Sequence, residues 1–192
     1  ASLADFRQQY GDDSKDIALE LPYVFKFDWG GEGETVYRID SGKDLENALQ
    51  KAADFEKSGQ KGFLLQEYVP TEGRTLRVAV IGRTLTSYWR IQENTDTFRS
   101  SVSQGARIDA TWAPERQNAA QVFVKNLCNK TGINLAGFDV IFAPVTEHIK
   151  PLMLEINYFF GRRGLGGSDA FYEILKKEVH NWLANALSGR DK

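Results

Sequence analysis

The sequence predicts an α+β protein in which short strands and helices alternate irregularly. Apolar residues recur at helical spacing over 43–57, and they do so again in the segment that follows Ser168. Short runs rich in β-branched and aromatic residues are typical of strands. Two such runs, 76–81 and 85–91, are separated only by a turn about Gly82, as in a hairpin. Hairpins among the helices fit α+β layers better than a doubly wound parallel sheet.

Composition narrows the class of protein. The chain has 192 residues, 42% of them hydrophobic, which is enough for a buried core in one or two domains. The net charge of −2 argues against a nucleic-acid partner, because such proteins usually carry a basic excess. The single cysteine, Cys128, excludes an internal disulfide, and its apolar neighbours predict a buried, unreactive thiol.

The chain carries no signal that would direct it to a membrane. Its apolar runs are too short for a membrane span, and no signal peptide opens it, so we expect a cytoplasmic protein without a membrane partner. It begins at Ala1 rather than at methionine, as a fragment of a longer protein would.

The first half of the chain contains a helix between predicted strands. The first 20 residues or so are polar and should form a helix or a tail. Ser41 is expected to cap a helix over 43–57, with Asp44 in a capping-box position. A glycine-rich turn, Asp28-Trp29-Gly30-Gly31-Glu32-Gly33, joins the first two strands. The predicted strands are 23–27, 35–39 and 63–69, and Pro70 stops the last of them.

The second half begins with the hairpin 76–81 and 85–91. The stretch 93–112 is predicted to be a loop with one short strand. Pro114 can begin a helix that residues 119–127 continue. Ser168 or Asp169 should cap the closing helix, on which seven apolar side chains line one face. The remaining predicted elements are strands 138–142 and 152–156, followed by a glycine- and arginine-rich segment, 161–167.

Three oxygen-bearing side chains predict a magnesium site. Glu155 and Asn157 share one face of a strand, because side chains alternate along it. A hairpin whose register centres near Glu147 would place Asp139 opposite Glu155. Two carboxylates and an amide oxygen are hard ligands of the kind that Mg²⁺ requires. The alternative is that these residues face solvent on a one-sided sheet.

Other segments suggest nucleotide binding. Lys26 ends an apolar strand just before the glycine turn, where a flexible loop and a lysine can contact phosphates. The turn is not a Walker A sequence, and it is also compatible with an ordinary hairpin. Polar or backbone groups of residues 66–69 could bind adenine, although an edge strand shows the same pattern.

Several arginines could bind anions. Arg77 begins an apolar strand, where a buried guanidinium needs an anionic partner, and Arg99 follows Phe98 in a polar stretch. Arg74 belongs to the same scattered set. Arg162 and Arg163 lie in a glycine-rich loop just after the proposed metal strand, where they could hold an anionic substrate. Surface salt bridges are the alternative for each of them.

Taken in order, these pieces resemble the ATP-grasp fold and, within it, the RimK and glutathione-synthetase-like carboxylate–amine ligases. The matching segments lie within residues 20–160. They are Val24-Phe25-Lys26, Leu65-Gln66-Glu67-Tyr68-Val69, Arg74-Thr75-Leu76-Arg77-Val78, Phe98-Arg99-Ser100-Ser101, Ala136-Gly137-Phe138-Asp139-Val140 and Leu154-Glu155-Ile156-Asn157.

The resemblance implies a role for each candidate residue. Lys26 would contact the phosphates of ATP. The arginines that would act near the γ-phosphate, the acyl phosphate and the substrate are Arg77, Arg99 and Arg162. The lid over the nucleotide would be Gly30, Gly31, Glu32 and Gly33, and the adenine hinge would be Gln66, Glu67, Tyr68 and Val69. The ligands of Mg²⁺, or of Mn²⁺ in its place, would be Asp139, Glu155 and Asn157.

The resemblance also implies two subdomains that grip ATP. Residues 1–69 would form the small subdomain, with its N-terminal part incomplete, and residues 70–192 the large subdomain with the metal site. The N-terminal substrate domain of complete ligases is not visible in the sequence. The chain departs from the family at Phe27-Asp28, where Lys-Pro is usual, and after Asn157, where Tyr158 to Gly164 replace a short Ser-x-Pro-Gly turn.

The expected function is formation of an amide or peptide-type bond between a small-molecule or peptide carboxylate and an amine, through an acyl phosphate. A non-catalytic ATP-binding module and a phosphotransferase on the same fold are the alternatives. The sequence leaves the substrates and the oligomeric state open.

Overall fold

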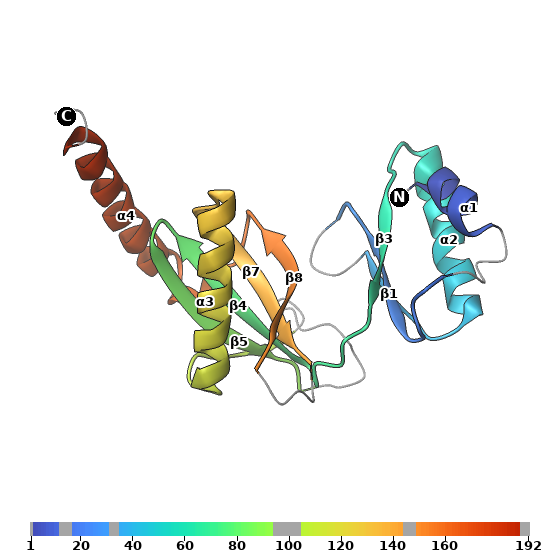
Figure 1. Ribbon diagram of the computed structural model, residues 1–192, viewed down its shortest axis with the longest axis horizontal. Coiled ribbons are helices and arrows are strands. Elements are labelled where there is room, and N and C mark those ends of the chain that lie inside the picture. Colours follow the sequence, from blue (N-terminus) through green and yellow to red (C-terminus); the bar gives the residue numbers. More distant parts are fainter. Residues whose placement is uncertain (1, 12–16, 31–34, 94–104, 144–148, 189–192) are drawn as a thin grey trace. The chain divides into compact units, whose positions relative to one another are not determined.

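The computed structural model describes residues 2–11, 17–30, 35–93, 105–143 and 149–188 (Figure 1). It contains two compact units, Ala1–Val69 and Pro70–Lys192. Helices and antiparallel strands build both, which confirms the predicted α+β class. In the described part of the chain, no helix has the length and apolar character needed to cross a membrane.

The first unit is a three-stranded antiparallel sheet covered by helices on one face. Its elements are α1 (Leu3–Tyr10), β1 (Tyr23–Phe27), β2 (Val36–Ile39), α2 (Gly42–Lys57) and β3 (Phe63–Glu67), with strand order β2-β1-β3. Figure 1 shows α1 and α2 lying together against the sheet. Alternation along β1 directs Tyr23, Phe25 and Phe27 into the core beneath them.

Local contacts fix the two helices of this unit. The Ser41 hydroxyl accepts a hydrogen bond from the backbone N–H of Asp44, as predicted for the N-cap of α2. Ser2 and Asp5 form a capping box at α1. The backbone N–H of Leu3 donates to Glu56 Oε1 at 2.8 Å, so α1 is attached to α2.

The second unit is a five-stranded antiparallel sheet with strand order β6-β5-β4-β7-β8. Its strands are β4 (Arg74–Ile81), β5 (Thr84–Ile91), β6 (Arg107–Asp109), β7 (Leu135–Phe142) and β8 (Pro151–Asn157). Its helices are α3 (Pro114–Thr131), the short 3₁₀ helix η2 (Arg163–Leu165) and α4 (Ser168–Ser188). The segment that contains α3 separates β5 and β6 from β7, yet β7 pairs with β4 in the middle of the sheet (Figure 1).

The two faces of this sheet differ in character. The face toward α3 is apolar and forms the main core, including Leu76, Val78, Trp89, Phe138 and Val140. On the other face, η2 and the start of α4 cover only one end, where a smaller apolar cluster gathers around Phe171. The rest of that second face is polar. Strict alternation along the strands produces this division.

A β-bulge interrupts the pairing of β7 with β8. Asp139 is paired with Glu155, but the next residue, Val140, is paired with Met153, so Leu154 is the extra residue. Met153 packs against the core on the α3 side. The bulge therefore changes the phase of β8, and Met153 and Glu155 serve opposite faces although they are two residues apart.

The closing helix α4 is only partly covered. Glu178 attaches it to the β4–β5 turn, where its carboxylate accepts hydrogen bonds from Arg83 N at 2.9 Å and Thr84 Oγ1 at 2.8 Å. These bonds lower the pKa of Glu178. Of the predicted apolar face, Phe171 is buried and Ile174 and Leu175 pack beside it. The helix then continues away from the sheet (Figure 1), and its later members are exposed, namely Val179, Trp182, Leu183 and Leu187.

Candidate functional site

Polar and charged side chains from four strands lie together on the polar face of the second sheet. We call this group the polar cluster; it consists of Thr75, Arg77, Tyr88, Arg90, Asp139, Glu155 and Asn157. In each strand these positions alternate with the residues that pack against α3. The cluster thus lies on the opposite side of the sheet from the main core.

Asp139 is the centre of the polar cluster. It is 2% exposed, and its carboxylate accepts two hydrogen bonds from Arg77, through Nε and, at 3.1 Å, through Nη2. Arg90 Nη2 lies 2.8 Å from the same carboxylate. Burial by itself raises the pKa of Asp139. The adjacent guanidinium groups of Arg90 and Arg77 lower this pKa by a larger amount, so its net shift is downward. The buried aspartate is therefore held ionised.

Glu155 and Asn157 complete the predicted metal-ligand set at one place. Glu155 is the register partner of Asp139, as the expected hairpin register requires, and Asn157 is paired with Gly137. The Asn157 amide nitrogen donates to Glu155 Oε1 at 3.1 Å and lies 3.4 Å from Asp139 Oδ2. The Asn157 amide nitrogen thus contacts both carboxylates, so the three side chains lie together.

The donor chemistry of these three residues fits Mg²⁺. Rotating the Asn157 amide by half a turn would present its oxygen to the space that the carboxylates share. Glu155 is exposed and can accept a ligand without burial. Within the described ranges, no three His, Cys, Asp or Glu side chains form a group that could hold a metal, so a cation here would need the Asn157 oxygen.

Arg90 belongs to this site although the sequence analysis did not single it out. Its Nε donates to Thr75 Oγ1 at 3.1 Å, while Nη2 contacts Asp139. One signal was present in the sequence. Alternation along β5 puts Arg90 on the same face as Tyr88, and Tyr88 is the register partner of Arg77.

The segment after β8 folds back onto the polar face. The Tyr88 hydroxyl donates a long hydrogen bond, 3.5 Å, to the carbonyl of Gly161. A Cβ at Gly164 would come within 2.2 Å of the Tyr88 ring, so only glycine allows this close approach. The Arg162 guanidinium lies over the rings of Phe171 and Tyr172, 4.4 and 4.7 Å from their centroids. Arg162 thus contacts α4.

The candidate nucleotide-binding residues of the first unit are partly brought together. Lys26 and Gln66 lie on adjacent strands, on the sheet face opposite to that of Phe25, whereas Glu67 is paired with the core residue Tyr23. Gly30 has a φ of +91°, which favours glycine.

Two of the other residues predicted for nucleotide binding lie just after β3. Tyr68 and Val69 follow β3, and the guanidinium of Arg38 lies 4.7 Å from the Tyr68 ring centroid. Gly31, Glu32, Gly33 and Arg99 lie outside the described residues.

Comparisons of the sequence with curated proteins find distant relatives. No protein-family model matches the chain. "Probable alpha-L-glutamate ligase" of Xanthomonas euvesicatoria pv. vesicatoria (strain 85-10) is 28% identical over 160 residues, which are 81% of this chain and 50% of that protein. The protein of the same name from Coxiella burnetii (strain Dugway 5J108-111) is 25% identical over 185 residues, 94% of this chain and 56% of that one. The chain thus spans about half the length of these relatives.

Solved structures share the fold. D-alanine--D-alanine ligase from Bacillus anthracis matches with a TM-score of 0.59 and 13% identity, covering 100% of this chain and 59% of that one. The RimK domain ATP-grasp protein from Sphaerobacter thermophilus DSM 20745 gives 0.54 and 16%, with 83% and 52% coverage. The ADP complex of purK, N5-carboxyaminoimidazole ribonucleotide synthetase, gives 0.54 and 14%, with 84% and 38% coverage.

The fold is therefore that of the ATP-grasp proteins, and the chain corresponds to part of it. More particularly, its sequence is distantly homologous to the probable alpha-L-glutamate ligases over about half of their length.

Proposed function

We propose that the chain is the ATP- and Mg²⁺-dependent part of a carboxylate–amine ligase. ATP would phosphorylate a carboxylate, and an amine would attack the resulting acyl phosphate to form an amide, releasing phosphate and ADP. The convergence of Asp139, Glu155 and Asn157 beside two arginines supports this proposal. The ligase relatives support the reaction class.

The polar cluster would handle charge in this reaction. Asp139, Glu155 and Asn157 would hold Mg²⁺, which when bound would offset negative charge on the phosphates. Arg77 would bind phosphoryl oxygens, for which its planar fork is suited. Arg99 and Arg162 would contact the acyl phosphate and the carboxylate substrate. These groups would act by positioning and by charge stabilisation rather than by covalent chemistry.

Residues of the first unit would bind the nucleotide. Lys26 would contact the phosphates, and the glycine-rich turn from Gly30 to Gly33 would cover them. Main-chain and polar groups of residues 66–69 would bind adenine. Support comes from Lys26 and Gln66 sharing the sheet face opposite to that of Phe25.

The names of the relatives make L-glutamate the first substrate to test. The experiment measures ADP release by the complete natural protein with ATP, Mg²⁺, L-glutamate and a panel of carboxylates and amines. Glu155→Gln should lower the turnover rate by about 10²–10³-fold or more, with an unchanged circular dichroism spectrum. Glu173→Gln, which removes an exposed carboxylate on α4, is the matched control and should keep parental turnover. Parental activity in Glu155→Gln would show that the metal assignment is wrong.

The same assay separates the two alternatives. ATP binding without turnover would indicate a nucleotide-binding module; the coverage of only half of the relatives' length is compatible with that function. A stable phosphorylated product formed without an amine would indicate a phosphotransferase.

A further inference from the structure

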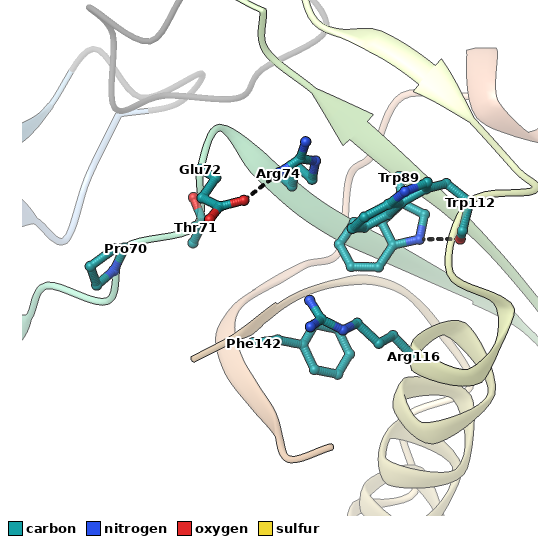
Figure 2. Close-up of a pocket in the computed structure, with 8 residues that line it drawn as sticks. All are labelled: Pro70, Thr71, Glu72, Arg74, Trp89, Trp112, Arg116 and Phe142. Carbon is teal, nitrogen blue, oxygen red and sulfur yellow. Dashed lines mark hydrogen bonds and ion pairs between the residues drawn. The ribbon is translucent and has the colours of Figure 1, made fainter. Parts of the chain in front are cut away.

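A cavity of about 150 Å³ lies on the other side of the second sheet from the polar cluster. Figure 2 shows its walls, which come from the start of the unit, from β4 and β5, from the segment that leads into α3, from the first turn of α3, and from the end of β7. The lining residues are Pro70, Thr71, Glu72, Arg74, Trp89, Trp112, Arg116 and Phe142. Trp89 and Phe142 belong to the core on the α3 side, so this arginine–tryptophan pocket does not share the sheet face of the polar cluster.

Aromatic rings form a fixed wall of the arginine–tryptophan pocket. Trp89 and Trp112 meet edge to face, with centroids 4.7 Å apart, and Phe142 lies 5.8 Å from Trp89. The Trp89 indole N–H donates to the carbonyl of Trp112 at 2.8 Å, and the Gln117 side-chain amide donates to the same carbonyl at 3.0 Å. These bonds hold the Trp112 segment in place, so the wall is preformed.

Two guanidinium groups complete the lining. Arg74 lies 5.0 Å from the Trp112 centroid and is paired with Glu72 at 2.6 Å. Arg116 lies 5.5 Å from the Phe142 centroid. Among the residues that the structure describes, no carboxylate pairs with Arg116. The Glu72 carboxylate offsets one of the two positive charges, which leaves the lining with a net charge of +1.

The backbone near Arg116 adds to this positive field. Arg116 lies in the first turn of α3, and Ala113, at the N-cap, supplies no side-chain acceptor. No side chain caps the helix N-terminus, although the acidic residue Glu115 also lies in its first turn. The pocket thus combines an aromatic wall, a guanidinium to which the described residues supply no acidic partner, and the N-terminus of a helix.

We propose that this arginine–tryptophan pocket binds a small aromatic carboxylate. A volume of about 150 Å³ can hold a molecule of the size of benzene, so one six-membered ring with a carboxylate at its edge matches the space. The ring would pack against Trp112, which is 37% exposed whereas Trp89 is 1% exposed, and the carboxylate would accept two hydrogen bonds from the Arg116 fork. A single negative charge balances the net charge of the lining.

The test is titration of the complete chain with benzoate, followed by the NMR signals of the indole N–H groups. Benzoate should shift the Trp89 and Trp112 signals in a saturable way and leave those of Trp29 and Trp182 in place, because these two lie outside the pocket. Benzamide has the same shape without the charge and should bind at least about tenfold more weakly.

Variants locate the binding. Arg116→Gln should weaken benzoate binding about tenfold or more, and Arg116→Lys should fall between it and the parent because it keeps the charge but loses the fork. Lys125→Gln removes one positive charge from an exposed position of the same helix and should bind as the parent does. The proposal fails if benzoate causes no saturable shift at Trp89 or Trp112, if benzamide binds equally well, or if folded Arg116→Gln binds like the parent. The benzoate–benzamide comparison needs no variant, so misfolding of Arg116→Gln would not leave the question open.

Discussion

Arg77 and Asp139 are register partners on the adjacent strands β4 and β7, and the guanidinium of Arg77 holds both carboxylate oxygens of Asp139 in the interior. The two residues are 62 positions apart in the chain. Each satisfies a charge that would be costly to bury alone. The polar cluster is thus a structural unit as well as a candidate site, and its stability can be tested apart from any reaction.

Arg77→Met should destabilise the protein by about 3 kcal/mol, because it leaves the buried Asp139 with one guanidinium in place of two. Urea unfolding at neutral pH measures this. The double variant Arg77→Met/Asp139→Leu should regain only part of the loss, since it removes the buried carboxylate but also takes the Asp139 partner away from the nearly buried Arg90. A single variant as stable as the parent would contradict this account of the pair.

Acid should weaken the same contact. The pKa of Asp139 in the folded protein lies below its usual value of 3.8. The unfolded chain therefore binds the proton more readily, and the contribution of Asp139 to stability is complete above pH 3.8 and is lost as the pH falls through the lower pKa of the folded state. Denaturation of the parent and of Asp139→Asn between pH 7 and pH 3 checks this. The stability advantage of the parent should shrink only below about pH 4; a difference that is constant over the range would exclude it.

Gly164→Ala should destabilise the second unit by about 1–3 kcal/mol, as overpacking does, because the added Cβ would overlap the buried Tyr88 ring. Thermal unfolding is the measurement. Gly161→Ala is the matched control three positions earlier, where a Cβ meets no atom within 4 Å. If both variants unfold at the parental temperature, the close packing of Gly164 on Tyr88 is not needed for stability.

Glu178→Gln should loosen α4. The substitution replaces a charged acceptor of two hydrogen bonds from the β4–β5 turn with a neutral one. Loss of about 1 kcal/mol of local stability corresponds to about fivefold faster amide exchange in α4, with α3 unchanged. Hydrogen–deuterium exchange measures both helices in one experiment. Glu173→Gln on the same helix should leave the exchange rates at parental values.

The sequence predicted the faces of the strands better than the neighbours of each strand. The period-two pattern, together with an assumed hairpin register centred near Glu147, predicted Asp139 opposite Glu155, and these two residues are register partners. The Arg77–Asp139 pair was not foreseen, because β4 and β7 are joined only through a long connection that includes α3. Adjacency of that kind depends on tertiary packing and leaves no local pattern.

Two other features could not be predicted from the sequence: the exposed end of α4 and the ring contacts of Arg162. The apolar stripe of α4 predicts a covered face, but the sheet beneath it ends, and Trp182 stays exposed. Arg162 is predicted to contact an anionic substrate, and the sequence did not predict that its guanidinium also lies over the rings of Phe171 and Tyr172. Aromatic faces attract a guanidinium as carboxylates do, and the sequence does not choose between them.

The extra residue at the bulge, Leu154, determines which side chains of β8 lie on the polar face of the sheet. Without it, β8 would keep a single phase, and Met153 and Glu155 would both point to one side. Removing Leu154 would then either move Glu155 away from Asp139 or move Met153 out of the apolar core on the α3 side. A substitution in β8 changes one side chain on one face, but a deletion of Leu154 would change the side chains on both faces of the sheet together.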